Sequence, residues 1–236
     1  GKYSFFNEKA QRYMIWRAGA NYGYNNNAGT LDTYNATYCD WSINQGSSVD
    51  DTYYMITTTM YFMPGAVILR SFDLIHWEIL TYVYDELDHT PGQCLIGEKH
   101  AYAQGMWAAS LRYHKGTFYV CFIANDTQKT YLYQAENILG PWKKKNIAGF
   151  YHDCSLLFDD DDRVYLAYGN RHIYVTELKA DLSGPKPGGL HRMVVSDEGN
   201  PSLGYEGAHF YKINGKYYLF FIHSLRTEWK RVEACF

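Results

Sequence analysis

The 236-residue chain lacks the features that would direct it to a membrane or to nucleic acid. No apolar run approaches ~18 residues, the length that spans a bilayer as a helix. The longest basic cluster is "WKKK" at 142–145, and the net charge is −3 at pH 7. A protein without a basic patch has no electrostatic footprint for nucleic acid or for an anionic membrane surface. The composition therefore predicts no nucleic-acid partner and no membrane partner.

The chain also lacks a cysteine framework and a visible export signal. Its five cysteines are odd in number and widely spaced, with no CxxC pair. This pattern predicts reduced thiols rather than a disulfide scaffold. The first residues, "GKYSFFNEKAQRYMIW", contain no signal-peptide core. These observations favour a cytoplasmic location, although the N-terminus could be incomplete.

No segment shows a sustained helical period, whereas strand patterns recur along the chain. Four strings open on a Gly or Asp turn and continue as an extended run of Tyr, Phe and Val: "DTYYMITTTMYF" (51–62), "GTFYVCFIAN" (116–125), "DRVYLAYGN" (162–170) and "GKYYLFFIHS" (215–224). The 24 tyrosines suit this pattern, because Tyr is a strand former. The sequence therefore predicts an all-β protein.

The strand patterns also repeat. The first three strings are each followed by a related unit, at 67–79, 130–144 and 173–186, in which a strand leads to Asp-Leu or Asn-Ile. A repeat of roughly 45 to 65 residues is typical of a propeller or a solenoid. Small antiparallel sheets bury their faces by radial packing. We therefore predict about four blades within residues 39–236, preceded by a loop-rich lead-in at 1–38.

The segment "FYHDCSLLFDDDDRVYLAYGN" (150–170) holds five aspartates in two kinds of position. Asp159–Asp162 stand between two strand patterns, where acidic residues are typical of a solvated turn. Asp153 instead precedes "CSLLF", a candidate innermost strand. The innermost strand of each blade lines the central channel, so a polar residue at its start faces a shared pocket. Asp153 is thus a candidate site residue, with a strand-entry cap as the structural alternative.

Two other blades have the same layout. Glu206 precedes the strand "AHFYKI", and Trp107 enters the strand "AASLRYH". Two carboxyl groups and an aromatic platform around one pocket are what glycoside cleavage requires, because an acid protonates the leaving oxygen, a base activates water and a ring stacks on the sugar. His209 follows Glu206 by three positions, which places it on the opposite strand face and predicts a structural role.

Four motifs resemble the blades of glycoside hydrolase family 43: "YYMITTTMYFMPGAVILRSFDLIHWEI", "MWAASLRYHKGTFYV", "HDCSLLFDDDDRVYLAYG" and "YEGAHFYKINGKYYLF". The resemblance covers residues 51–236. It implies a five-bladed β-propeller and an inverting β-xylosidase, α-L-arabinofuranosidase or arabinanase that acts on plant cell-wall oligosaccharides. It further implies that Glu206 is the general acid, and that Asp153 orients this acid and tunes its pKa.

The resemblance is weaker in two places. The family carries its general base in a "DP[SD]" segment, where this chain reads "YCDWSINQGSSVDDTYYM". An ungapped alignment puts Ile43 at the base position, and "INQGSSV" replaces the expected apolar inner strand. Asp40 is the nearby carboxylate on the N-terminal side, so it is the candidate base, although using it requires a three-residue bulge. A catalytically impaired sugar-binding propeller without a base is the alternative function.

The second departure is the fifth blade, which the family would place beyond Phe236. Four blades alone would form an open ring, so we expect either a fragment or self-association through the open propeller edge. A protein-interaction propeller of the WD-repeat kind is disfavoured, because the "GH…WD" signature is absent.

The remaining predicted pocket residues are sugar contacts. Trp107 is the candidate sugar platform, His152 neighbours Asp153, and Met60 and Phe62 could line the pocket from the first blade, with ordinary core positions as their alternative. We predict no cofactor and no metal ligands in the sequence. The family resemblance makes a structural calcium ion conceivable, but no ligands for it can be identified.

Overall fold

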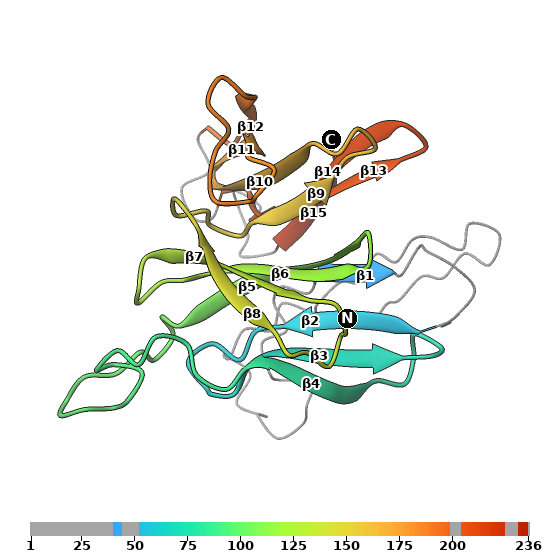
Figure 1. The fold of residues 1–236 in the computed structure, drawn as a ribbon. Helices are drawn as coiled ribbons and strands as arrows, with labels where there is room; N and C mark the ends of the chain where they lie inside the picture. The colour runs from blue at the N-terminus through green and yellow to red at the C-terminus, as the bar shows by residue number, and fades with distance from the viewer. Residues whose placement is uncertain (1–39, 44–51, 199–203, 225–230, 236) are drawn as a thin grey trace.

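The computed structural model describes residues 40–43, 52–198, 204–224 and 231–235, which contain strands and connecting turns and no helix (Figure 1). No helix within these residues is long and apolar enough to cross a membrane. The predicted lead-in at 1–38 lies outside the described residues. The all-β prediction is confirmed for the part of the chain that the structure describes.

The strands form four sheets in which neighbours in sequence are also neighbours in space. The first sheet contains β1 (Asp40–Ile43), β2 (Tyr53–Thr57), β3 (Gly65–Ser71) and β4 (Glu78–Tyr84). The second contains β5 (Met106–His114), β6 (Thr117–Ala124), β7 (Lys129–Ala135) and β8 (Lys143–Ile147). The third contains β9 (Ser155–Phe158), β10 (Val164–Asn170), β11 (His172–Leu178) and β12 (His191–Ser196). The fourth contains β13 (Glu206–Ile213), β14 (Lys216–Ser224) and β15 (Arg231–Cys235).

Tight turns set the register of the inner hairpins. Lys115 and Gly116 connect β5 to β6, with φ angles of 47° and 80°. Asn214 and Gly215 connect β13 to β14, with φ angles of 51° and 75°. Positive φ at both central residues defines the type I′ turn, whose twist matches that of an antiparallel pair. By setting the register, these turns also fix which residues stand at the beginnings of β5 and β13, at the opposite end of each hairpin.

The first strands of the four sheets lie beside one another. β1 contacts β5, β5 contacts β9, and β9 contacts β13. In Figure 1, β2–β4 lie below β5–β7, and the strands of the third and fourth sheets lie above them. Apolar side chains fill the space between consecutive sheets, as a propeller requires. The largest cluster joins the first two sheets and includes Ile56, Ile68, Leu111 and Phe122, all fully buried. The predicted arrangement of about four blades is therefore confirmed.

The expectation for Asp159–Asp162 is partly wrong. The turn between β9 and β10 is present, but Asp159 is only 3 % exposed. Its carboxylate bonds to the Lys212 ammonium group and the Tyr217 hydroxyl group of the fourth sheet. A buried carboxylate must be paired, and here the pairing joins two blades. Asp159 thus holds the third and fourth blades together instead of solvating a turn.

Phe122 offers a test of the interface between the first two blades. Its ring is fully buried and stacks on Tyr84, Tyr131 and Tyr133, with centroids 5.4 to 5.9 Å apart. We expect Phe122→Ala to lower the free energy of unfolding by about 3–5 kcal/mol, because it leaves a cavity. Denaturant titration measures this loss. Phe72→Ala is the control, since Phe72 is 63 % exposed, and an equal loss in both variants would contradict the assignment.

Candidate active site

The ends of two inner strands bring three titratable side chains together. His152 and Asp153 precede β9, and Glu206 begins β13. The Nε2 atom of His152 lies 3.4 Å from Oδ2 of Asp153 and 3.8 Å from Oε2 of Glu206. One ligand-type atom from each residue lies within 4.8 Å of the other two. The convergence of Asp153 and Glu206 that the strand positions predicted is therefore present in the structure.

Asp153 is built into the junction of the third and fourth blades. It is 2 % exposed, and its Oδ2 atom accepts a hydrogen bond from the backbone N–H of Gly207 at 2.9 Å. Its φ angle of 47° is left-handed, a conformation that Asp tolerates better than most residues. Burial raises the pKa of Asp153 to about 6, with the positive charge of His152 opposing and the negative charge of Glu206 adding to the rise.

His152 and Asn170 form the immediate surroundings of Glu206. Burial by itself would lower the pKa of His152, but the carboxylates of Glu206 and Asp153 outweigh it and hold this pKa above its usual value. When protonated, the imidazole offsets part of the negative charge of the carboxyl pair. The amide of Asn170, at the end of β10, donates a hydrogen bond to Oε2 of Glu206 at 3.2 Å. Sequence reasoning missed Asn170, because an Asn at the end of a strand resembles an ordinary turn residue.

Trp107 stands beside this group, as predicted. Its ring lies 5.4 Å from the His152 ring in an edge-to-face arrangement. The indole Nε1–H donates to the carbonyl of Ala103 at 3.2 Å, which fixes the ring orientation. Trp107 is half-buried. It can therefore present apolar surface to a ligand while remaining anchored.

Arg112 of β5 holds the inner strands in register, and its role could not be read from the sequence. Its guanidinium group donates to the Leu156 carbonyl at 2.7 Å and to the Ser155 hydroxyl at 2.8 Å. The Ser155 hydroxyl oxygen in turn accepts the N–H of Phe210 at 3.0 Å. This chain runs from β5 through β9 to β13. It therefore fixes the relative position of the strands that carry Asp153 and Glu206.

The prediction for His209 rested on a regular strand, and the strand is irregular. The pairing of β13 with β14 shifts between Glu206 and His209, so that one extra residue stands on β13. Such a bulge cancels the alternation of strand faces. A positive charge on His209 would lower the pKa of Asp153, as the last and smallest of the contributions to it. The three-residue spacing therefore did not place His209 away from the carboxyl pair.

The structure describes only the backbone at Asp40. β1 begins there, and Asp40 pairs with Ile56 of β2. β1 is thus formed by "DWSI", and "NQGSSV" (44–49) lies outside the described residues. The corresponding strand pair of the fourth sheet gives a comparison, because Glu206 of β13 pairs with Ile222 of β14. When "YYL" of β14 is aligned with "YYM" of β2, Ile222 corresponds to Thr58. Asp40 pairs with Ile56 instead, two residues before Thr58, so it lies two positions deeper in β1 than Glu206 lies in β13. The role of Asp40 as base stays a prediction.

Met60 and Phe62 occupy the connection between β2 and β3. The Met60 carbonyl accepts the N–H of Met106, next to Trp107, at 2.8 Å. Phe62 is 55 % exposed, so the core alternative does not hold for it. Both residues thus belong to a segment that abuts the start of β5.

The three titratable residues are also the described residues best placed to hold a metal ion. They offer one imidazole nitrogen and two carboxylates, whereas calcium takes six to eight oxygen ligands. A structural calcium ion stays an expectation from the family resemblance alone.

A radial array of small sheets whose inner strands bring an Asp and a Glu together beside a Trp is the arrangement expected of a propeller glycoside hydrolase. The sequence profile of Glycosyl hydrolases family 43 matches residues 33–227. The chain belongs to this family.

Named relatives agree with this assignment. A non-reducing-end α-L-arabinofuranosidase of Bacteroides ovatus is 33 % identical over 175 residues, or 72 % of this chain and 32 % of that protein. A β-xylosidase of Formosa agariphila is 30 % identical over 202 residues, or 79 % of this chain and 32 % of that protein. The chain thus spans about a third of the length of these relatives.

Solved structures of the same family share the fold. A bifunctional GH43-CE protein of Bacteroides eggerthii superposes with a TM-score of 0.71 at 42 % identity, over 80 % of this chain and 25 % of that one. A xylan β-1,4-xylosidase of Bacillus halodurans gives a TM-score of 0.66 at 25 % identity, over 84 % of this chain and 38 % of that one. The predicted propeller family is therefore confirmed.

Asp153 predicts a pH dependence of stability. Its pKa rises from 3.8 to about 6 on burial, so the folded state binds its proton more tightly than the unfolded state does. The folded state gains this stabilisation fully below pH 3.8 and loses it as the pH rises through 6. Asp153→Asn carries no ionisable carboxyl group. Its free energy of unfolding, relative to the parent protein, should therefore increase between pH 4 and pH 6 and then level off.

Thermal or urea unfolding of both proteins across pH 4–8 measures this difference. Asp161→Asn is the matched control, because Asp161 is exposed in a turn. A difference between parent and Asp153→Asn that does not vary with pH would contradict the burial argument.

Proposed function

We propose that this chain forms the catalytic propeller of an inverting glycoside hydrolase that releases arabinofuranose or xylose from hemicellulose-derived oligosaccharides. The observation that carries this proposal is the pairing of Glu206 with the buried Asp153 at the ends of two inner strands. The names of relatives as α-L-arabinofuranosidase and β-xylosidase support the two sugars.

The geometry supports distinct roles for the two carboxyl groups. Inverting enzymes separate acid and base by about 6.5–9.5 Å, which leaves room for the attacking water. An oxygen atom of Asp153 lies within 4.8 Å of an oxygen atom of Glu206. This separation is too short to hold the attacking water between acid and base, so Asp153 is not the base. Asp153 is also almost fully buried and bonded to Gly207. It therefore acts on Glu206 and does not contact the anomeric carbon.

The reaction then proceeds as a single displacement. Glu206 donates its proton to the glycosidic oxygen while the bond from this oxygen to the anomeric carbon breaks. A water molecule attacks the anomeric carbon from the opposite face and transfers a proton to the base carboxylate. Asn170 and His152 hold the Glu206 carboxyl group in position, and Trp107 supports the sugar ring. We assign the base to Asp40, at the start of the inner strand β1.

Substitution of Glu206 tests the acid. We expect Glu206→Gln to lower kcat on arabino- or xylo-oligosaccharides by roughly 10²- to 10⁴-fold, because the leaving oxygen departs unprotonated. The loss should be smaller on nitrophenyl arabinofuranoside and xyloside, whose leaving group needs less protonation. Asp160→Asn, in an exposed turn, should leave both rates unchanged. Equal losses on both kinds of substrate would remove Glu206 as the acid.

Substitution of Asp40 tests the base and also separates the alternative function. We expect Asp40→Ala to lower hydrolysis of nitrophenyl glycosides by roughly 10²- to 10⁴-fold. Azide or formate should restore turnover of this variant, because a small anion takes the place of the missing carboxylate. If the parent protein itself turns over only with azide, the chain is the impaired sugar-binding propeller. If Asp40→Ala is as active as the parent, another residue is the base.

A further inference from the structure

Four aromatic rings form an exposed cluster beside the candidate active site. The rings of Phe62 and Tyr61 lie 4.4 Å apart, those of Tyr61 and Tyr102 4.8 Å apart, and those of Tyr102 and His100 4.6 Å apart. We call these four residues the aromatic cluster. Phe62 is 55 % exposed and Tyr102 is 49 % exposed. Rings that only completed a core would be buried, so the cluster offers apolar surface to something outside the blades.

The cluster is continuous with the catalytic pair. Tyr102 is adjacent in sequence to Ala103, whose carbonyl accepts the Trp107 indole N–H at 3.2 Å. Trp107 in turn contacts His152, which lies 3.8 Å from Glu206. A path of contacts thus leads from Glu206 through Trp107 to the cluster. A ligand with its scissile bond at Glu206 that extends past Trp107 would meet these rings next.

The segment that carries Met60, Tyr61 and Phe62 is held against the start of β5. The Thr58 hydroxyl group donates to the Met106 carbonyl at 2.6 Å, and the Met106 N–H donates to the Met60 carbonyl at 2.8 Å. A Cβ atom at Gly105 would stand 2.5 Å from the Met60 carbonyl oxygen. Glycine at position 105 therefore allows the close approach that joins this segment to the Tyr102 side.

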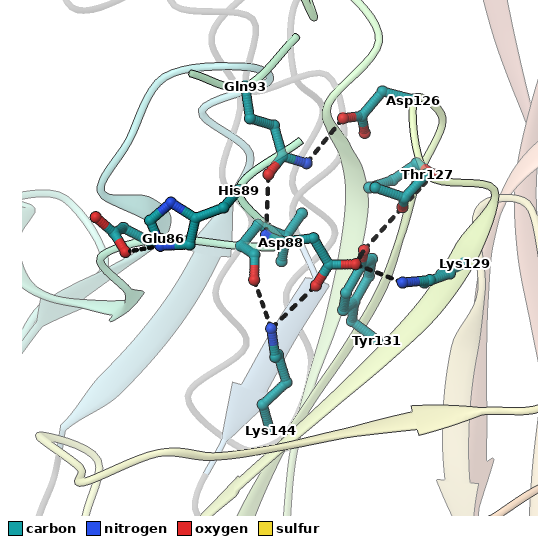
Figure 2. Close-up of polar contacts among 11 residues, drawn as sticks. Glu86, Asp88, His89, Gln93, Asp126, Thr127, Lys129, Tyr131 and Lys144 are labelled. Carbon is teal, nitrogen blue, oxygen red and sulfur yellow. Dashed lines mark hydrogen bonds and ion pairs between the residues drawn. The ribbon is translucent and has the colours of Figure 1, made fainter. Parts of the chain in front are cut away.

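The loop from 85 to 105, which carries His100 and Tyr102, is fixed at Asp88 (Figure 2). The Asp88 carboxylate pairs with Lys129 at 2.6 Å and with Lys144 at 3.0 Å, and it accepts the Tyr131 hydroxyl group at 2.8 Å. These three partners belong to the second blade. Because two cations and a hydroxyl group share one carboxylate, the start of the loop cannot shift without breaking several charge-assisted bonds.

Gln93 extends this attachment. Its side chain accepts the Asp88 N–H at 2.9 Å and donates to the Asp126 carboxylate at 2.8 Å (Figure 2). The Asp126 N–H then donates to the Gln104 carbonyl at 2.7 Å. The loop is therefore tied to the β6–β7 turn on both sides of the rings it carries. A rigid support of this kind reduces the entropy that binding would otherwise lose.

We propose that the aromatic cluster binds the pyranose units of a β-1,4-linked xylose chain that extends from the candidate active site past Trp107. This inference rests on the proposed function and assigns its substrate as a chain of several units. A β-linked xylose unit has all its substituents equatorial and no exocyclic CH₂OH group, so both its faces present C–H bonds. Such faces pack on aromatic rings, while the tyrosine hydroxyl groups can bond to sugar oxygens.

Binding by calorimetry tests this assignment without requiring turnover. Glu206→Gln is the background, so that the ligand survives the titration. We expect xylotetraose to bind this protein more tightly than xylobiose. Adding Phe62→Ala or Tyr102→Ala should weaken tetraose binding by roughly 2- to 12-fold per ring, the equivalent of one aromatic contact, and leave biose binding unchanged.

Two further variants complete the design. Phe72→Ala is the matched control, because Phe72 is 63 % exposed and follows the end of β3 that is remote from the pocket; it should not change either affinity. Tyr102→Leu keeps apolar bulk but removes the ring. Its circular dichroism and melting temperature should match those of the background, while its tetraose affinity falls as in Tyr102→Ala.

The outcomes separate this inference from the proposed function. Equal affinities for biose and tetraose, or an equal effect of Phe72→Ala, would overturn the xylose-chain assignment. Tighter binding of an arabino-oligosaccharide of the same length, or of a protein in place of any oligosaccharide, would also overturn it. If xylotetraose binding falls when a ring is removed but the parent protein hydrolyses no glycoside, the role of the cluster in binding is supported. That result would overturn only the proposed hydrolytic function.

Discussion

The candidate site depends on one buried carboxylate at the junction of two blades. The Asp153 carboxylate is almost completely shielded from water, and it accepts a hydrogen bond from the backbone N–H of Gly207, the residue that follows Glu206. Removal of a charge from water is costly unless partners compensate. The Gly207 N–H, the neighbouring His152 and a raised pKa supply this compensation. The position of the Glu206 side chain is consequently coupled to the contact between the third and fourth blades.

The chain arranges comparable polar links elsewhere between neighbouring blades. Arg112 connects the second blade to the third, and Lys212 connects the fourth to the third through Asp159. Apolar packing between sheets has no direction of its own, whereas a fork of N–H donors fixes both distance and orientation. The propeller thus uses its apolar clusters for cohesion and its few buried polar bonds to place the inner strands.

Much of the fold and of the candidate site was predictable from the sequence, and the predictions that were wrong have a common cause. Strand patterns and the repeat predicted the blades. The positions of Asp153 and Glu206 at the starts of inner strands predicted that the two side chains converge. The burial of Asp159 depends on Lys212, 53 residues away, and the bulge at Glu206 changes the face of His209. Pattern reasoning treats each strand as regular and each turn as isolated, so it could not see contacts made between blades.

The fixation of the 85–105 loop has a consequence for how such a protein can diversify. Its ionic attachment at Asp88 uses β7 and β8, the outer strands of the second blade, whereas the hydrogen bond from Gly207 to Asp153 joins the third and fourth blades. Exchange of exposed residues in the middle of the loop can therefore leave the Asp153–Gly207 contact intact, whereas a change of the backbone at Ala103 would reach Trp107.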